Sequence, residues 1–356
     1  MKKAIRIICI VLAAVVLLAA GYVAYVFLAF HRIGDQALPV GGADGGEALR
    51  AGEEYRVLSY NIGFGAYESD YGFFMDGGTQ SWAWSKERLD ANLKNIAAFL
   101  KEQDADLTLV QEVDIDATRS YHFDERTYLV PALAPQAWVF AQNYDSPFLF
   151  YPFTQPHGAS KAGIMTFTKA APVTAARRVE LPIENGFTKF LDLDRCYSKS
   201  RIPAGERELV LYNLHLSAYT SDGLIANEQL RLLLDDMEAE YAAGNWCIAG
   251  GDFNKDLLGD SSVWFGKADQ EYTWAQPIPA ELLDGYHASL VAPLDEADPV
   301  PSCRNADGPY REGQFVLTID GFLVSDNVTA VSSEVIDTGF AWSDHNPAAM
   351  RFVLEN

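Results

Sequence analysis

Cysteine is scarce in this chain of 356 residues, which contains four. Cys9 lies in an apolar run near the N-terminus, and the other three are too few to form a disulfide framework. Cys247 stands inside a short apolar segment and is expected to be a small buried side chain. Cys196 and Cys303 could form one disulfide, and the sequence alone leaves that pairing open.

Basic side chains are also in short supply, because 27 Lys and Arg residues face 49 Asp and Glu residues. The formal net charge is -22, and the three basic residues at the extreme N-terminus contribute +3, so the rest of the chain carries -25. Such a surface repels polyanions at long range, which argues against tight, processive binding of nucleic acid. It does not exclude a nuclease that approaches phosphates through bound divalent cations.

Charged side chains are absent from residues 7–30, a run of 24 positions. About 20 apolar residues cross a bilayer, so we expect a transmembrane anchor here. Lys2, Lys3 and Arg6 favour a cytoplasmic N-terminus over residues 1–6, with the rest of the chain outside the cytoplasm. A cleaved signal peptide is the alternative, but its apolar region is usually about 7–15 residues long.

The remainder divides into two parts. Residues 31–54 are rich in Gly, Ala and Asp and lack apolar periodicity, which predicts a flexible tether. Residues 55–356 have a mixed α/β pattern without an internal repeat, and their number is at the upper end for one core. We therefore expect one folded domain, monomeric, on a single-pass anchor in the cell membrane.

Helix and strand patterns alternate in this domain. One predicted helix has its apolar residues on one face over residues 89–100, after Ser85 as a possible N-cap. A second covers residues 224–243 and stops at a glycine. Residues 256–314 show no steady period and are expected to form long loops near the site, or an insertion. The predicted strands cover residues 55–60, 107–111, 162–167, 208–214, 246–249, 317–324 and 348–353.

Six short segments place acidic, amide or imidazole side chains at or near the ends of strands. Any one of them alone fits an ordinary turn or a solvated side chain, and their order along the chain is the informative feature. They are Ser59-Tyr60-Asn61, Val110-Gln111-Glu112, Asn213-Leu214-His215, Gly250-Gly251-Asp252-Phe253-Asn254, Thr318-Ile319-Asp320 and Ser343-Asp344-His345.

Glu112 follows an apolar run. A carboxylate at a strand end that faces a cleft suits Mg²⁺, which takes one or two carboxylates and keeps several waters. Asn61 ends the first predicted strand, and its amide could hold Glu112 or a water on the metal. In the alternative reading, Asn61 starts a turn and Glu112 is solvated.

Asp252 and Asn254 flank Phe253 after two glycines. Positions i and i+2 of an extended segment face the same side, so the carboxylate and the amide point into one space while Phe253 packs. Such a pair could activate a water and hold it against phosphorus, as hydrolysis of a phosphate ester requires. An Asx turn after a buried strand is the alternative.

His215 and His345 are two of only six histidines. With an unperturbed pKa of about 6.5, histidine suits proton transfer and the binding of transition-state charge. A buried carboxylate can orient an imidazole and favour its protonated form, and we assign Asp320 to His345 as that partner. A single histidine at a strand end is usually structural, but two among these segments indicate a site.

Taken together, the six segments resemble the endonuclease/exonuclease/phosphatase superfamily, the deoxyribonuclease-I-like fold that includes neutral sphingomyelinases and inositol-polyphosphate 5-phosphatases. The resemblance covers nearly all of residues 55–356. It implies a four-layer α/β sandwich with two central mixed β-sheets and a site at one edge, here preceded by an N-terminal transmembrane helix. It also implies Mg²⁺, or Mn²⁺ in its place, with Glu112 as the main ligand, Asn61 beside it and Asp344 near the metal or its water.

By the same likeness, Asp252 and Asn254 would position or activate the attacking water. His215 and His345 would contact phosphate or transfer protons, with Asp320 paired to His345. The general base is assigned differently across the family. Residues 121–161 depart from the family pattern, so the family's site tyrosine and second acidic residue have no position in this sequence.

Three functions are compatible with this reading. The first is an outward-facing, membrane-tethered phosphodiesterase or phosphatase that acts on phospholipid head groups or small phosphate esters. The second is an extracellular nuclease for DNA or RNA, which would use basic groove residues such as Lys161, Lys199 and Arg201. The third is a noncatalytic binding module of the same fold, which the loss of a metal or histidine position would favour, and none is lost. Aromatic residues between Tyr67 and Trp84 could touch lipid or substrate, although packing explains most of them.

Overall fold

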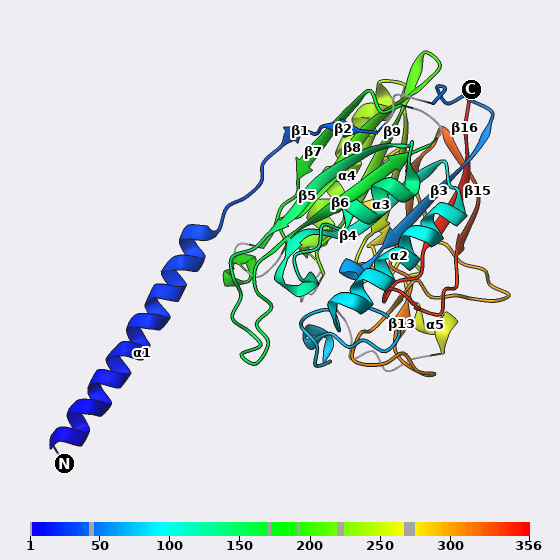
Figure 1. Cartoon of the computed structure of the whole chain (residues 1–356). Helices are drawn as coiled ribbons and strands as arrows, with labels where there is room; N and C mark the ends of the chain where they lie inside the picture. Colours follow the sequence, from blue (N-terminus) through cyan, green and yellow to red (C-terminus); the bar gives the residue numbers. More distant parts are fainter. Residues whose placement is uncertain are drawn as a thin grey trace.

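The computed structural model describes residues 2–42, 46–169, 172–184, 186–190, 193–218, 224–266 and 275–356. Helix α1 (Lys2–Ala29) extends from an α/β body as a long rod (Figure 1). It has no buried residue, and the mean hydropathy of an 18-residue stretch within it is 2.9. It is long and apolar enough to cross a membrane, a test that a signal sequence near an N-terminus also passes.

Two seven-stranded sheets form the centre of the body. The first has the order β1-β7-β8-β9-β10-β14-β11 and the second the order β15-β16-β3-β4-β6-β5-β2, and β12 pairs with β13 separately. β9 runs parallel to β10, and β3 runs parallel to β4. The adjoining pairs β10–β14, β16–β3 and β4–β6 are antiparallel, so both sheets are mixed. The strands are β1 (Gln36–Ala37), β2 (Val40–Gly41), β3 (Glu54–Asn61), β4 (Leu107–Ala117), β5 (Ala137–Asp145), β6 (Ser160–Thr168), β7 (Ala175–Glu180), β8 (Cys196–Ala204), β9 (Arg207–His215), β10 (Trp246–Asp252), β11 (Ala288–Val291), β12 (Cys303–Arg304), β13 (Val316–Leu317), β14 (Asp320–Ser325), β15 (Val328–Val335) and β16 (Ala348–Leu354).

Helices cover the outer faces of the two sheets. α2 (Lys86–Gln103) and α3 (Arg126–Leu133) pack on the second sheet, and α4 (Leu224–Ala242) packs on the first. A third apolar core fills the space between the sheets. α5 (Ser262–Phe265) is a single turn. These layers confirm the four-layer α/β sandwich with two mixed sheets that the sequence predicts.

The ends of the two long helices follow from local chemistry. The Ser85 hydroxyl accepts a hydrogen bond of 3.2 Å from the backbone N–H of Arg88, which caps α2 as expected. Gly244 adopts a positive φ of 89° two residues after α4 ends, a conformation that glycine takes without strain. Both predicted helices therefore exist close to their predicted bounds.

Residues 31–54 are not a flexible tether where the structure describes them. β1 pairs with β7, β2 pairs with β5, and Leu49 is 1% exposed. Arg32 forms an ion pair with Asp194 and donates to the carbonyl oxygen of Leu181. The segment lacks apolar periodicity because its short strands are held at sheet edges by backbone pairing, which does not require that periodicity.

The predicted strand over residues 317–324 is also wrong in one respect, because it is two strands. β13 ends at Leu317 and β14 begins at Asp320, so Asp320 starts a strand. Residues 256–314 are largely loops, as expected, and residues 267–274 of that segment lie outside the described part. The sequence did not predict α3, β5, β7, β8, β11 or β15.

The cysteines and most of the aromatic residues near Tyr67 have structural roles. Cys196, Cys247 and Cys303 are buried and free, so the disulfide left open by the sequence does not form. Tyr67, Tyr71 and neighbouring rings fill a small core of their own, which confirms packing as their main role.

Candidate active site

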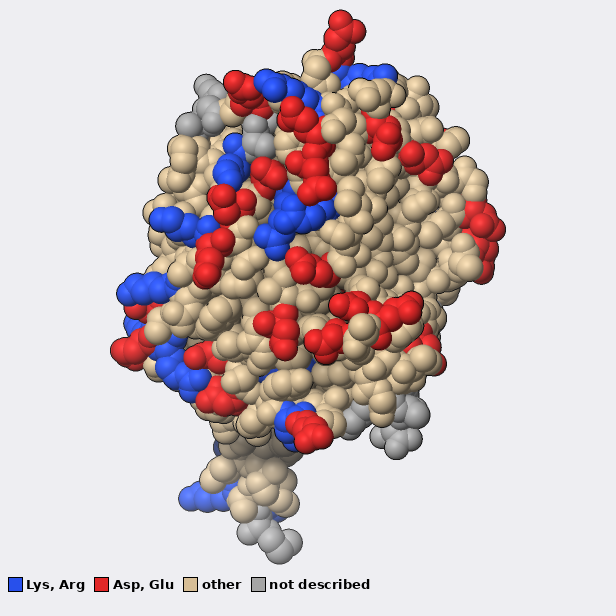
Figure 2. Space-filling model, turned by 90° about the vertical axis from the view of Figure 1, so that its right-hand side faces the viewer, with Lys and Arg blue, Asp and Glu red and all other residues tan. Residues whose placement is uncertain are grey.

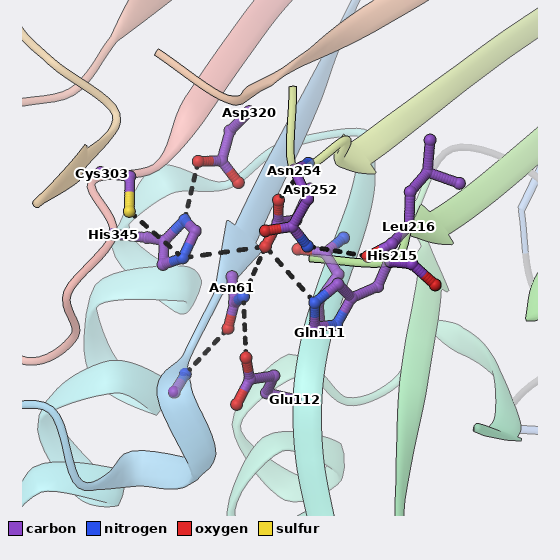
Figure 3. Close-up of polar contacts among 12 residues, drawn as sticks. Asn61, Gln111, Glu112, His215, Leu216, Asp252, Asn254, Cys303, Asp320 and His345 are labelled. Atoms are coloured by element: carbon purple, nitrogen blue, oxygen red, sulfur yellow. Dashed lines mark hydrogen bonds and ion pairs between the residues drawn. The ribbon is translucent and has the colours of Figure 1, made fainter. Parts of the chain in front are cut away.

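Strand register brings a histidine and two carboxylates into one row. β10 pairs with β9 so that Asp252 stands opposite His215, and it pairs with β14 so that Asp252 also stands opposite Asp320. His345 approaches from the loop before β16, so Asp252 lies between two imidazoles (Figure 3). The Oδ2 atom of Asp252 is 3.5 Å from Nε2 of His215 and 3.8 Å from Nε2 of His345.

The backbone after β10 fixes Asp252 and Asn254. Gly251 has a φ of 147°, and a Cβ atom there would lie 2.0 Å from the carbonyl oxygen of Leu214, so only glycine fits. The N–H of Asn254 donates to Oδ1 of Asp252 at 2.8 Å, and its amide Nδ2 donates to the carbonyl oxygen of Leu216 at 2.8 Å. Phe253 is fully buried. The structure therefore brings the two polar side chains together as predicted, with the amide oxygen of Asn254 left as an acceptor.

His345 and Asp320 form the pair that the sequence predicts. Nδ1 of His345 lies 2.8 Å from Oδ2 of Asp320, and the same oxygen accepts a hydrogen bond of 2.7 Å from the Ser302 hydroxyl. Nε2 of His345 is then directed toward Asp252, with the thiol of Cys303 at 3.7 Å (Figure 3). The carboxylate thereby fixes which nitrogen of the ring faces the site.

Glu112 was expected at a strand end, but β4 continues to Ala117 and Glu112 projects from an irregularity within it. Val110 pairs with Met165 and Val113 with Gly163, so two residues of β4 stand opposite one residue of β6, as in a β-bulge. Glu112 itself has a φ of 56°, a strained conformation for a residue other than glycine. The bulge turns its carboxylate out of the regular strand pattern.

Asn61 connects Glu112 to Asp252. Its Nδ2 atom lies 3.2 Å from Oε1 of Glu112 and 3.0 Å from Oδ2 of Asp252, while its oxygen accepts from the N–H of Gly63 at 3.0 Å. One of the two alternatives for Asn61, that its amide holds Glu112, is thus confirmed. Since β3 and β10 belong to different sheets, this amide also joins the two sheets at the site.

A second amide contact joins the sheets beneath the site. Nε2 of Gln111 donates to Oδ1 of Asn213 at 2.8 Å, and both side chains are fully buried. Buried amides need such partners because an unpaired one costs about 1–3 kcal/mol. Gln111 and Asn213 therefore hold the strands that carry Glu112 and His215 rather than facing a substrate.

Burial and neighbouring charges shift the pKa values of the two histidines in opposite directions. Burial alone would lower the pKa of His345, but the Asp320 carboxylate raises it well above the usual value. Burial, together with the positive charge of Arg195, holds the pKa of His215 well below the usual value. The site thus contains one protonated and one neutral imidazole near neutral pH.

Burial acts on the carboxylates in the opposite direction. It raises the pKa of Asp252 to about 7 and that of Asp344 to about 6, because a charged carboxylate loses its hydration in the cleft. Asp344 is held near Asn61 because the neighbouring Ser343 hydroxyl donates to the carbonyl oxygen of Asn61 at 2.8 Å. A cation in the cleft would favour the charged forms of both carboxylates.

A cleft of about 290 Å³ opens over these groups. Of the eight predicted site residues, six line it, and Asn61 and Asp320 lie behind them. The lining ones are Glu112, His215, Asp252, Asn254, Asp344 and His345.

The cleft also contains residues that the sequence analysis missed. Arg119 lies over the ring of Phe64 at 3.9 Å and forms an ion pair of 2.8 Å with Asp114. His157 and Tyr144 come from the region of poor family likeness, residues 121–161, where only their spatial position reveals them. Arg195 and Arg304 also line the cleft, and no sequence signal distinguished them from other arginines.

The donor set fits a hard divalent cation. Glu112 and Asp344 have no ion pair with Lys or Arg within the described part of the chain, and carboxylate oxygens are the ligands that Mg²⁺ prefers. Ligand atoms of Asp252, Asp320 and His345 also lie within 4.8 Å of one another, close enough to hold a metal. Because Asp320 favours the protonated form of His345, that trio also serves as a hydrogen-bonded network.

The basic residues expected of a nuclease groove do not line the cleft. Lys199 contacts Asp236 and Glu240, and Arg201 contacts Glu208 and Glu240, so both are neutralised on β8. On the face drawn in Figure 2, blue basic side chains lie among red acidic ones and form no continuous basic patch.

Comparison with known proteins supports the same conclusion about fold. No curated protein matches the sequence. The structure resembles an endonuclease/exonuclease/phosphatase from Beutenbergia cavernae DSM 12333, with a TM-score of 0.58, 19% identity, and coverage of 85% of this chain and 72% of that one. It also resembles ANGEL2, a 2',3'-cyclic phosphatase solved in complex with adenosine-2',3'-vanadate, with a TM-score of 0.56, 16% identity, and coverage of 90% and 99%.

A third similar structure is the endonuclease/exonuclease/phosphatase from Bacteroides vulgatus, with a TM-score of 0.54, 15% identity, and coverage of 85% of this chain and 100% of that chain. At these identities the likeness establishes the fold alone. The model of the Endonuclease/Exonuclease/phosphatase family matches residues 58–345, which span all the segments assembled at the cleft. This chain therefore belongs to the endonuclease/exonuclease/phosphatase family.

Proposed function

We propose that this protein is a Mg²⁺-dependent phosphodiesterase or phosphatase whose catalytic domain is held outside the cytoplasm by α1. The observation that carries the proposal is the position of Asp252 between two imidazoles, in a cleft where Glu112 and Asp344 form no ion pair with Lys or Arg in the described part of the chain. Water would attack phosphorus within that cleft. The family supports phosphoric ester hydrolysis in general, and the metal, the location and the substrate are our inferences.

The protonation state of each side chain determines its role in the reaction. Asp252, with its pKa raised to about 7 by burial, accepts a proton from the attacking water, and the amide oxygen of Asn254 orients that water. His345, kept protonated by Asp320, binds a phosphoryl oxygen and stabilises negative charge in the transition state. Neutral His215 completes the other side of Asp252 and contacts the phosphate.

Glu112 would hold the Mg²⁺ ion, with Asn61 fixing the carboxylate and Asp344 accepting hydrogen bonds from water on the metal. When bound, the ion would polarise a phosphoryl oxygen and offset charge that develops during the reaction. Mn²⁺ has the same preference for oxygen ligands and is expected to substitute.

Lys2, Lys3 and Arg6 at the start of α1, and the uncharged run that follows them, support a single-pass anchor with the domain outside. Phospholipid head groups or small phosphodiesters fit the acidic surface better than DNA or RNA does, and a monomer is sufficient because one chain supplies every site residue. A nuclease is less well supported because Lys199 and Arg201 are neutralised. A noncatalytic module is less well supported because the chain has lost none of the metal-ligand or histidine positions.

Hydrolysis assays on the full chain in detergent micelles test the proposal. Plasmid DNA, sphingomyelin and phosphoinositides are offered with Mg²⁺ or with EDTA, to the native protein and to the His345→Ala variant. We expect lipid cleavage that requires both Mg²⁺ and His345. His287→Ala is the matched control, since that imidazole is exposed and paired with Glu238. DNA cleavage with the same dependence would make the protein a nuclease, and no turnover of any substrate would favour the binding module.

A further inference from the structure

The connection between β5 and β6 is unusual in composition. Residues 146–160, here called the aromatic loop, contain no Asp, Glu, Lys or Arg, in a chain of which 21% of residues are charged. The side chains of Phe150, Tyr151 and Phe153 are 51%, 62% and 84% exposed. The loop, green in Figure 1, extends beyond the body on the side where α1 leaves it. Large apolar groups exposed together on a soluble surface mark an interaction site.

The aromatic loop is tied to α1 by specific contacts. The Tyr22 hydroxyl donates to the carbonyl oxygen of Phe148 at 3.0 Å, and the N–H of Phe148 donates to the Tyr25 hydroxyl at 3.0 Å. The ring of Tyr22 packs edge-on against Phe150, with centroids 5.0 Å apart. Both backbone polar groups of Phe148 therefore have partners without water, as a chain at membrane depth requires.

The position of those tyrosines along α1 sets the depth of the loop. A helix of 28 residues is about 42 Å long, which exceeds the hydrocarbon thickness of about 30 Å. A span that begins after Arg6 needs about 20 residues, so Tyr22 and Tyr25 fall near the outer interface, where tyrosine is enriched. A loop held against them reaches the boundary between head groups and acyl chains. Lys189, 5.5 Å from the ring of Phe30, places a cation at the level of the head groups.

An aromatic strip continues from the loop to the cleft. The ring of Tyr151 lies 5.7 Å from that of Phe74, which in turn lies 5.9 Å from the imidazole of His157. His157 lines the cleft, as does Met75, whose side chain is 57% exposed at the rim. The apolar surface that meets α1 is thus continuous with the mouth of the candidate active site.

We propose that the aromatic loop is a second membrane contact beside α1, inserted at the bilayer surface so that the mouth of the cleft faces the lipid. The substrate class is then a phosphate ester whose apolar part stays in the bilayer while its phosphate enters the cleft. A bilayer is the occupant of this surface because the loop is continuous with a helix that has the length of a membrane span. The substrate class rests on the proposed hydrolase function, whereas the membrane contact does not.

Labelling the full chain in lipid nanodiscs tests the contact. A Cys9→Ser background removes the exposed thiol, the other three cysteines are buried, and Phe153→Cys provides one site for an environment-sensitive fluorophore. Val331→Cys is the control, since Val331 is 50% exposed on β15, at the opposite edge of the sheet that contains β5. We expect doxyl-labelled lipid to quench the fluorophore at position 153 and not at position 331. Quenching by aqueous iodide alone at position 153 would overturn the contact.

Activity with two phosphodiesters tests the substrate class. The Phe150→Ser/Phe153→Ser variant is compared with native protein on phospholipid in the nanodisc and on water-soluble bis(p-nitrophenyl) phosphate. We expect lipid turnover to fall about ten-fold or more with soluble turnover unchanged, and Val331→Ser to change neither. Equal losses on both substrates, or none on either, would overturn the substrate class. If native protein hydrolyses neither substrate while position 153 is quenched by lipid, the hydrolase proposal fails and the membrane contact stands.

Discussion

Acidic side chains serve two different purposes in two regions of this molecule. On the face shared by β8 and α4, Glu240 contacts both Lys199 and Arg201, and Asp236 contacts Lys199. Every carboxylate there has a cation, so the cluster satisfies itself and holds α4 on its sheet. Such pairs contribute stability and need no ligand.

In the cleft, four carboxylates have different surroundings. Glu112 and Asp344 form no ion pair with Lys or Arg in the described part of the chain, and the ion pairs of Asp252 and Asp320 there are with histidine rings. Burying a carboxylate is costly, and burial raises the pKa of Asp252 to about 7 although His345 offsets part of that effect. The comparison shows that an ion pair with Lys or Arg marks the structural carboxylates. Neither acidity nor position at a strand end separates them from the functional ones.

The largest effect should follow from Asp252→Asn. The amide keeps the shape of the side chain but cannot accept the proton from water, so we expect kcat to fall by about 10²–10⁴-fold. Asp236→Asn, in the paired cluster, should leave kcat near the native value. Steady-state kinetics on a phosphodiester makes the comparison, and similar losses in both variants would erase the distinction between the two regions.

A smaller loss is expected from Asn61→Ala. This amide joins Glu112 to Asp252 without contacting phosphate, and loss of such a supporting contact typically costs about 10–100-fold in metal affinity or activity. Added Mg²⁺ should recover part of the activity. Asn327→Ala, which removes a hydrogen bond to the backbone of Asn245, is the control. If Mg²⁺ dependence is the same in native protein and Asn61→Ala, Asn61 does not position the ligand.

In the paired cluster, Glu240→Gln should affect stability instead. It leaves Lys199 and Arg201, both largely buried or half-buried, without one of their carboxylates. We expect the free energy of unfolding to fall by about 1–3 kcal/mol, with kcat unchanged. Denaturant unfolding beside kinetics measures both. A lower kcat at unchanged stability would contradict a purely structural role.

The smallest expected effect concerns pH and His157. Burial, with the charge of Arg119, lowers the pKa of His157 to about 3 in the folded protein, whereas the unfolded chain takes up this proton near pH 6.5. The unfolded state therefore binds more protons between those values, and stability falls as pH drops from 6.5 toward 3. We expect His157 to account for about 2 kcal/mol of lost stability at pH 5. Unfolding of native protein and His157→Phe at pH 7.5 and 5 measures it, and equal losses would contradict the assignment.

Part of the site could be predicted from the sequence because Asn61, His215 and Asp252 end strands whose apolar runs are easy to recognise. Glu112, which the sequence places at a strand end, lies inside β4 at its bulge. Strand ends at one edge of a sandwich meet in space, so order along the chain was sufficient to group Asn61, His215 and Asp252. The pairing of Asp320 with His345 also follows from chemistry, because a buried imidazole near a carboxylate shares its proton.

The features that sequence could not predict depend on tertiary pairing. β8 carries Lys199 and Arg201 at alternate positions, which look solvent-exposed until Glu240 of α4 is placed beside them. β1 and β2 are two-residue edge strands with no periodicity of their own. Arg119 and His157 reach the cleft from segments with no motif. Each of these depends on a neighbour that is distant in the sequence.

Binding of Mg²⁺ to the full chain, measured by titration calorimetry, tests the central claim that Glu112 and Asp344 hold a cation in the cleft. The account predicts binding by native protein that weakens at least about ten-fold in Glu112→Gln. It also predicts native affinity in Glu334→Gln, whose carboxylate is exposed on β15. Equal affinities in the native protein and Glu112→Gln, or no binding to the native protein, would contradict it.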